Sequence, residues 1–403
     1  HGKAVVYFRH IGRLYAGDRI IDRSGTDSSK HTFDAAKGKT PDMIPLWVAD
    51  MDFKAPDEVI QRMKDRCEHG IFGYTRVGEG YIRAVQGWFE KRFDWKVPEE
   101  WMVRTPGVVY AVNAAIQVLT QEGDAVLIQS PVYHPFNNCI VASKRRTVRN
   151  PLVYDGKRYT IDFEDFEKKI VEEKVKLFVL CSPHNPVGRV WTREELTRMG
   201  EICLKHHVFV ISDEIHCDFV FSGHRHIPFA SICESFARNS ITCTAPSKTF
   251  NLAGLQTSNI FIPDETVREQ IKACKSAQHC GEPTIFGLVA CQAAYECGEE
   301  WLEQLLAYLE TSAEKVSAYF AQNLPQIHVV KPEGTYLLWL DCRGLPIPPE
   351  QVDAFMLEKA KVWFNDGGMF GTEGIGFERM NMGSPWSVLE QACARIVDAA
   401  KKL

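Results

Sequence analysis

The sequence predicts an α/β protein with a mainly parallel β-sheet and a second, smaller α+β domain. From Asp124 onward, short apolar runs alternate with helical patterns. The runs are apolar on both faces, as in strands that helices cover on both sides. Near Glu299 this alternation gives way to one long helical pattern followed by short strands, which indicates the second domain. Strands that alternate with helices favour parallel pairing, because each helix returns the chain to the same end of the sheet.

The large sheet is predicted from five apolar runs, which are residues 125–128, 176–181, 208–211, 241–243 and 257–261. Two helical patterns lie among or before them. Residues 192–206 begin with Thr192 and Glu195 at the spacing of a capping box. Residues 108–119 form the other pattern, directly after Gly107.

The C-terminal part is predicted to contain a helix over residues 299–322, strands near 327–330 and 336–340, and a helix near 349–360. We therefore expect three segments. Residues 16–58 form an N-terminal arm and part of the small domain, residues 59–295 the large domain, and residues 296–403 the small C-terminal domain.

Composition limits the function classes. The chain has 403 residues, 45% hydrophobic and 25% charged, which is enough apolar surface for two packed domains. The net charge of −5 and the lack of a long single-sign run give no reason to expect nucleic acid or an anionic membrane as a partner. No apolar stretch reaches the ~18–20 residues that span a bilayer, and residues 1–15 do not have the apolar core of a secretory signal.

Cysteine usage points to a reducing compartment. The 13 cysteines are an odd number, contain no C-x-x-C pair, and lie partly inside apolar runs. Free cysteine behaves there as a small hydrophobe. We therefore expect a cytoplasmic protein, and we expect no metal site.

Three predicted strands are followed by residues that can carry chemistry. Asn185 follows the run at 176–181, Asp213 follows 208–211, and Lys248 follows 241–243. In an α/β sheet, ligands bind beyond the carboxyl ends of the strands. Singly, these residues have ordinary explanations: a turn, a solvated charge and a surface lysine. Together they place an amide, a carboxylate and an amine at one edge of the sheet.

This set fits a cofactor with a pyridine ring. A lysine can form a Schiff base with its aldehyde, a carboxylate can keep the ring nitrogen protonated, and backbone amides at a helix start can hold its phosphate. Gly107, directly before the helical pattern at 108–119, permits close backbone approach there. Tyr133 follows the run at 125–128 and is either a residue that stacks on the ring or an ordinary core tyrosine.

The order Asn185-Pro186-x-Gly188, Asp213-x-x-His216 and Ser247-Lys248 resembles the fold-type I pyridoxal-5′-phosphate (PLP) enzymes of the aspartate aminotransferase superfamily. The chain is most similar to its cystathionine β-lyase and cystalysin branch, from about Asp18 to the C-terminus. The motifs that carry this narrower resemblance are residues 48–53, 72–75, 131–136, 182–190, 212–216, 245–254 and 374–381. The resemblance implies a seven-stranded sheet covered by helices, PLP as cofactor, and a homodimer with shared active sites.

The resemblance also implies catalytic and cofactor-binding roles. Lys248 would form the Schiff base, Asp213 would pair with the ring nitrogen, and Tyr133 would stack on the ring. Asn185 would bond the phenolic oxygen of the cofactor and border the substrate. His216 stands where aminotransferases usually carry a tyrosine, a difference shared with the lyase branch.

Further roles concern the phosphate and the substrate. The phosphate would be held by Gly107, Val108, Val109 and Ser247, with Tyr74 reaching in from the other subunit. Gln256 replaces a phosphate-binding arginine that many aminotransferases have, so other donors must compensate. Arg379 would hold the substrate α-carboxylate through its planar fork, and Ala49 would line the substrate site.

The predicted function is α,β-elimination from cysteine-type amino acids such as cystathionine or cysteine, giving a thiol or sulfide, pyruvate and ammonia. One alternative is an aminotransferase that uses the same site. Another is a PLP-bearing regulatory protein, which an exposed apolar patch away from the cofactor would favour. His216 and residues 48–53 favour the lyase over the aminotransferase.

Overall fold

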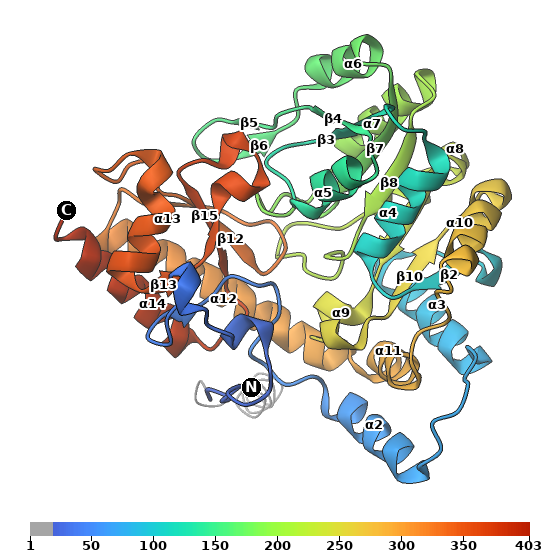
Figure 1. The fold of residues 1–403 in the computed structure, drawn as a ribbon, viewed down its shortest axis with the longest axis horizontal. Helices are drawn as coiled ribbons and strands as arrows, with labels where there is room; N and C mark the ends of the chain where they lie inside the picture. The colour runs from blue at the N-terminus through green and yellow to red at the C-terminus, as the bar shows by residue number, and fades with distance from the viewer. Residues whose placement is uncertain (1–18) are drawn as a thin grey trace, which may run out of the picture.

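The computed structural model describes residues 19–403 (Figure 1). The predictions on residues 1–15 and on the first three residues of the segment 16–58 lie outside this range. No helix among residues 19–403 is both long enough and apolar enough to cross a membrane.

A seven-stranded sheet forms the centre of the larger part, in the order β2-β10-β9-β8-β7-β3-β4. The neighbouring strands pair in parallel, except that β10 is antiparallel to both β2 and β9. The predicted, mainly parallel sheet is therefore confirmed. Its strands are β2 (Met102–Thr105), β3 (Ala125–Ile128), β4 (Arg146–Arg149), β7 (Val175–Cys181), β8 (Phe209–Asp213), β9 (Ser240–Thr244) and β10 (Ser258–Phe261).

Helices cover this sheet on both faces. Along β3, Val126 and Ile128 pack into a core with the helix α4, whereas Ala125 and Leu127 pack into a separate core on the other face. This alternation explains why the strand is apolar at every position. The helices of this part are α2 (Asp57–His69), α3 (Glu79–Phe93), α4 (Val108–Leu119), α5 (Pro135–Ala142), α6 (Phe163–Glu172), α7 (Arg193–Lys205), α8 (Glu234–Arg238), α9 (Pro246–Thr249), α10 (Glu265–Ala277) and α11 (Ile285–Cys297).

The predicted capping box is present at the start of α7. The Thr192 side chain accepts a hydrogen bond from the Glu195 backbone N–H, and the Glu195 carboxylate accepts one from the Thr192 N–H. These two bonds satisfy backbone donors that the first turn of a helix leaves free. The helix begins and ends within one residue of the predicted range.

The smaller part is built on a four-stranded antiparallel sheet, in the order β11-β12-β15-β14. Its strands are β11 (His328–Val330), β12 (Leu337–Asp341), β14 (Asn365–Asp366) and β15 (Phe377–Asn381). The long helix α12 (Glu299–Asn323) packs on this sheet at β11, and the last helix α14 (Trp386–Ala400) packs against α12. A short parallel pair, β1 (Ile44–Pro45) with β13 (Val362–Trp363), attaches the N-terminal segment to this part. The precise residues at which the domains divide stay a prediction.

One predicted helix is different in the structure. Residues 349–360 do not form one α-helix but three successive short turns: a 3₁₀ turn at Pro349–Gln351, α13 at Val352–Phe355 and a π-helical turn at Met356–Ala360. The 3₁₀ start is a common departure at the beginning of a helix. The apolar spacing of this segment predicted helical turns, but it did not distinguish between hydrogen-bonding patterns.

Candidate active site

A pocket of about 190 Å³ opens at the carboxyl ends of β7, β8 and β9. Ten of the twelve residues that the sequence analysis selected line it, namely Ala49, Gly107, Val108, Val109, Tyr133, Asn185, Asp213, His216, Ser247 and Lys248. Pro106, Cys181, Ile215, Ala253, Gln256 and Thr257 complete the wall. The strand ends therefore bring the predicted residues together, as the rule for α/β sheets requires.

Asp213 is the last residue of β8, and its buried carboxylate has few partners that would stabilise a negative charge. It accepts a hydrogen bond from the Ile215 backbone N–H at 3.1 Å. Among residues 19–403 it has no cationic partner within ion-pair distance. Burial raises its pKa to about 7, and the neighbouring Glu214 adds to the rise. A buried carboxylate in this state favours a ligand that brings a positive charge or a donated proton.

Lys248 lies on the short helix α9, directly after β9. Its Nζ donates a hydrogen bond to the Ala49 carbonyl oxygen at 2.7 Å. Burial lowers its pKa to about 8, and the nearby Arg379 lowers it further, while Asp50 and Asp213 act in the opposite direction. A half-buried lysine with a lowered pKa is suited to act as a nucleophile or a base near neutral pH.

The N-terminus of α4 borders the same pocket. Gly107 is its N-cap residue, and no side chain caps the helix there. A Cβ placed on Gly107 would have no atom within 4 Å, so there is open space beside the first turn. Free backbone N–H groups at the start of a helix attract anions. This end of the pocket therefore fits the phosphate of PLP, and Ser247 lines the same pocket.

Aromatic and amide side chains border the space between these charges. The Tyr133 N–H donates to the Asn185 carbonyl oxygen at 3.1 Å, and burial raises the pKa of the Tyr133 phenol to about 12. Burial lowers the pKa of His216 to about 3, so its ring is neutral, and its Nδ1 has no partner within residues 19–403. These groups can present neutral donors and a ring face to a planar ligand.

Arg379, on β15, does not line the pocket itself but reaches it through Asn185. Its Nη1 donates to Asn185 Oδ1 at 3.2 Å, and its Nη2 donates to Asn365 Oδ1 at 2.6 Å and to the Trp47 carbonyl oxygen at 3.0 Å. It is buried, and no carboxylate within residues 19–403 pairs with it. Burial lowers its pKa to about 10. A buried guanidinium without an anionic partner favours an anionic ligand.

Tyr74 is the predicted site residue that the single chain does not bring to the pocket. It is fully exposed in the connection between α2 and α3, which lies at the periphery of the molecule (Figure 1). Its predicted role was on the site of a second subunit, and that role stays a prediction.

Two contributions to the site were missed by the sequence analysis. Tyr336 is buried, stacks edge-on against the His216 ring at 5.8 Å between centroids, and donates its hydroxyl to the Ala49 carbonyl oxygen at 2.8 Å. Trp47 contributes its carbonyl oxygen to Arg379. Neither has a local sequence signal, because Tyr336 is an ordinary tyrosine directly before a strand and Trp47 acts through its backbone. No group of three or more His, Cys, Asp or Glu in the described part of the chain could hold a metal ion.

Curated relatives match nearly the whole chain. The chain is 42% identical over 379 residues to cystathionine beta-lyase PatB of Bacillus subtilis (strain 168), covering 94% of this chain and 98% of PatB. It is 32% identical over 390 residues to protein MalY of Escherichia coli (strain K12), covering 96% and 99%.

Solved structures give the same result. Cystalysin from Treponema denticola, which contains a pyridoxal 5′-phosphate cofactor, is 37% identical with a TM-score of 0.92, over 95% of this chain and 98% of that one. A PLP-bound putative aminotransferase from Clostridium difficile 630 is 44% identical with a TM-score of 0.93, over 95% and 99%. Residues 41–396 match the family described as aminotransferase class I and II. The chain belongs to this family.

Proposed function

We propose that the protein is a PLP-dependent carbon–sulfur β-lyase that converts cysteine-type amino acids, such as cystathionine or cysteine, into a thiol or sulfide, pyruvate and ammonia. One observation carries the proposal: a half-buried amine (Lys248) and a buried carboxylate (Asp213) without an ion-pair partner line one pocket, and a buried guanidinium without a carboxylate partner (Arg379) lies beside it. The likeness to a named cystathionine beta-lyase and to cystalysin supports the choice of reaction.

The residues would divide the binding of PLP among them. Lys248 would attach the cofactor through its amine, and Asp213 would hold the proton of the ring nitrogen. The N–H groups at the start of α4, with Ser247, would hold the phosphate. When bound, PLP supplies an electron-withdrawing ring that stabilises negative charge on the carbon bearing the substrate amine.

The substrate would be oriented and deprotonated by side chains already in place. Arg379 would bind the α-carboxylate, with Asn185 beside it. Lys248 Nζ, once released, would take the proton from Cα, which its lowered pKa favours at neutral pH. The C–S bond then breaks with the electron pair leaving on sulfur, which takes up a proton, and one water converts the remaining three-carbon enamine into pyruvate and ammonia. A thiol with a pKa of about 8.5 is a fair leaving group.

The reaction distinguishes this proposal from the aminotransferase alternative. Pure protein loaded with PLP is incubated with cystathionine, with and without an added keto acid, and pyruvate and thiol are measured. A lyase releases both products in equal amounts without keto acid. Consumption of cystathionine that requires the keto acid and releases no thiol would establish the aminotransferase instead. Binding of a protein partner without turnover of either substrate would support the regulatory alternative.

We also propose a homodimer whose active sites are shared. Apolar side chains gather on the connection after α2, where Ile71, Phe72 and Tyr74 are all exposed. A two-fold dimer would bury them and lend each Tyr74 to the partner subunit's site. The Tyr74 hydroxyl would then donate a hydrogen bond to the phosphate, at a site where Gln256 stands in place of the arginine of many aminotransferases.

Subunit mixing tests the shared site. A Tyr74→Phe chain and a Lys248→Ala chain each form impaired homodimers. If sites are shared, the mixed dimer has one site with both Lys248 and Tyr74, so mixing restores activity. Unchanged activity after confirmed subunit exchange would contradict the shared site.

All 13 cysteines are free, and on this ground we propose a reducing, cytoplasmic location.

A further inference from the structure

Residues 47–53, which we call the strap, pass the active site as a segment without helix or strand that bends at residues 48–49 and 52–53. Its backbone contacts both groups that the proposed reaction needs. The Ala49 carbonyl oxygen accepts hydrogen bonds from Lys248 Nζ at 2.7 Å and from the Tyr336 hydroxyl at 2.8 Å. The Trp47 carbonyl oxygen accepts one from Arg379 Nη2 at 3.0 Å. A displacement of the strap would therefore disturb Lys248 and Arg379 together.

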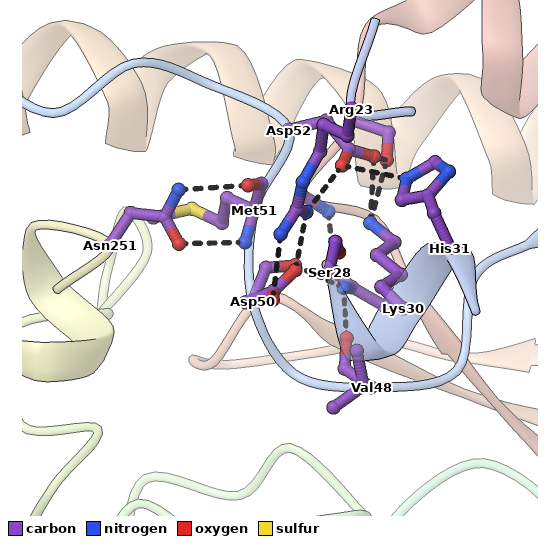
Figure 2. Close-up of polar contacts among 12 residues, drawn as sticks. Arg23, Ser28, Lys30, His31, Val48, Asp50, Met51, Asp52 and Asn251 are labelled. Atoms are coloured by element: carbon purple, nitrogen blue, oxygen red, sulfur yellow. Dashed lines mark hydrogen bonds and ion pairs between the residues drawn. The ribbon is translucent and has the colours of Figure 1, made fainter. Parts of the chain in front are cut away.

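Asparagine side chains hold the strap from two sides. Asn381 Nδ2 donates to the carbonyl oxygens of Val48 and Asp50 at 2.7 and 2.6 Å. Asn251 accepts from the Met51 N–H at 3.0 Å and donates to the Met51 carbonyl oxygen at 2.8 Å. Figure 2 shows the Asn251 amide lying along Met51, on the side of the strap opposite His31. Because Asn251 follows Lys248 by three residues and Asn381 follows Arg379 by two, these bonds tie the strap to both.

Charged residues of the N-terminal segment hold the remaining part. Arg23 contacts Asp50 through Nη1 at 2.7 Å and Nη2 at 3.1 Å, and it contacts Asp52 through Nη1 at 2.9 Å. Lys30 is fully buried, and its Nζ lies 2.7 Å from the second oxygen of Asp52. Figure 2 shows Arg23 between the two aspartates, with Lys30 and His31 converging on Asp52.

The ion pairs of Arg23 and Lys30 with Asp50 and Asp52 restrict the position of the strap. A buried ammonium such as that of Lys30 is costly unless it is paired, so the pairing leaves few alternative arrangements. Although burial opposes it, the His31 ring at 3.5 Å and the charge of Lys30 lower the pKa of Asp52, which therefore stays ionised at neutral pH. Without the two cations, the aspartates at positions 50 and 52 would repel each other on a segment that carries two active-site contacts.

We propose that Arg23, supported by Lys30, is a positioning residue for the active site. By holding Asp50 and Asp52, it keeps the Ala49 carbonyl on the Lys248 amine and the Trp47 carbonyl on Arg379. The inference rests on the proposed function, because it takes these two groups as the cofactor-binding amine and the carboxylate-binding guanidinium. A misplacement of about 1 Å at such a distance from the chemistry can cost about 100-fold in rate.

The test compares Arg23→Met, Arg23→Lys and a control, Lys37→Met. Met keeps an apolar stem without the charge, and Lys keeps the charge without the fork. Lys37 lies in the same N-terminal segment but pairs with Asp34 on the surface, with 79% of its side chain exposed. Three quantities are measured: the melting temperature, KM for cystathionine, and the rate at which apo-protein takes up PLP at Lys248. Uptake is followed by absorbance and by borohydride fixation to that residue, so it does not depend on turnover.

We expect Arg23→Met to slow PLP uptake and to raise KM, each by about tenfold. Arg23→Lys should lie between Arg23→Met and the wild type, and Lys37→Met should match the wild type. Asp50→Asn combined with Arg23→Met should add little to Arg23→Met alone, because Arg23 acts partly through Asp50.

Wild-type uptake and KM in Arg23→Met, with only a lower melting temperature, would overturn the inference and leave Arg23 a structural residue. If Arg23→Met does not fold, Arg23→Lys decides by the same measures, and failure of both to fold would equally overturn it. Failure of the wild type itself to fix PLP at Lys248 would instead refute the proposed function, whatever the variants do.

Discussion

Two regions of this molecule bury charged side chains, and they differ in how those charges are paired. In the connection between β7 and α7, Arg189 is buried with Glu333 at 2.9 Å and Glu195 at 2.8 Å. Beside the pocket, Arg379 is also buried but has only neutral partners, Asn185, Asn365 and a backbone carbonyl. Arg189 is paired with two carboxylates of the protein itself, whereas Arg379 has no anionic partner among the described residues.

The aspartates repeat this difference within one short segment. Asp218 accepts hydrogen bonds from Arg92 Nε, Trp88 Nε1 and Thr249 Oγ1. Asp213, five residues earlier, accepts a hydrogen bond from the Ile215 backbone N–H and has no ion-pair partner among the described residues. Burying an unpaired charge costs stability, so a fold that retains such charges at one pocket indicates a ligand that completes them. Mutations in the two regions should therefore have opposite signatures.

The largest effect is expected for Lys248→Ala. The variant loses both the attachment of PLP and the proposed base, so activity should fall by about 10³-fold or more. Borohydride should fix the cofactor to wild type at this residue and leave the variant unlabelled. Lys205→Ala, at an exposed ion pair with Glu167, serves as the control and should behave as wild type. Full activity of Lys248→Ala would refute the assignment.

Asp213→Ala and Asp218→Ala should separate the two regions. Asp213→Ala should lower kcat by about 100-fold or more, because the proposed support of the ring nitrogen is lost, while the apo-protein keeps its melting temperature. Asp218→Ala should lower the melting temperature markedly, because breaking a buried ion pair costs about 3–5 kcal/mol. Melting is the discriminating measurement, since Asp218 also contacts Thr249 beside Lys248. Equal turnover by Asp213→Ala and wild type would contradict the comparison.

The two arginines provide the next test. Arg379→Lys keeps the charge but loses the planar fork, so kcat/KM should drop by about 10- to 100-fold with cofactor absorbance and melting temperature near wild type. Arg189→Lys should reduce the melting temperature, because one ammonium cannot reach both Glu195 and Glu333, and kcat/KM of the folded protein should stay near wild type. A collapse of melting in Arg379→Lys with normal kinetics would make Arg379 structural.

The smallest effect concerns the pH dependence of apo-protein stability. The folded pKa of Asp213, raised to about 7, exceeds its unfolded value. The folded state therefore binds the proton more tightly, and its contribution to stability is complete below about pH 4 and lost as pH rises through 7. Asp213→Asn removes this term. Its melting temperature should exceed that of wild type at pH 8 by more than at pH 5, as calorimetry on both proteins would measure. An identical difference at both pH values would argue against the burial of an unpaired charge.

The sequence alone determined those parts of the molecule in which the signal is local. Apolar runs of three to six residues predicted five strands, and the residues that follow three of them had to meet at one sheet edge, because parallel strands share a carboxyl end. Asp213, Asn185 and Lys248 were found in this way. The capping box at Thr192 and Glu195 set the start of α7, since both of its bonds lie within four residues.

Only the tertiary structure decided the parts that depend on distant segments. The short strands β2 and β4 were not predicted, and the antiparallel direction of β10 follows from its pairing with β2 and β9, not from its composition. The strap contacts Lys248 and Arg379 through backbone carbonyls, which carry no residue-specific signal. Arg23 and Lys30 read as ordinary charged residues in the sequence. Their pairing with Asp50 and Asp52 depends on a chain path that crosses more than twenty residues, and such a path is set by packing, not by local propensity.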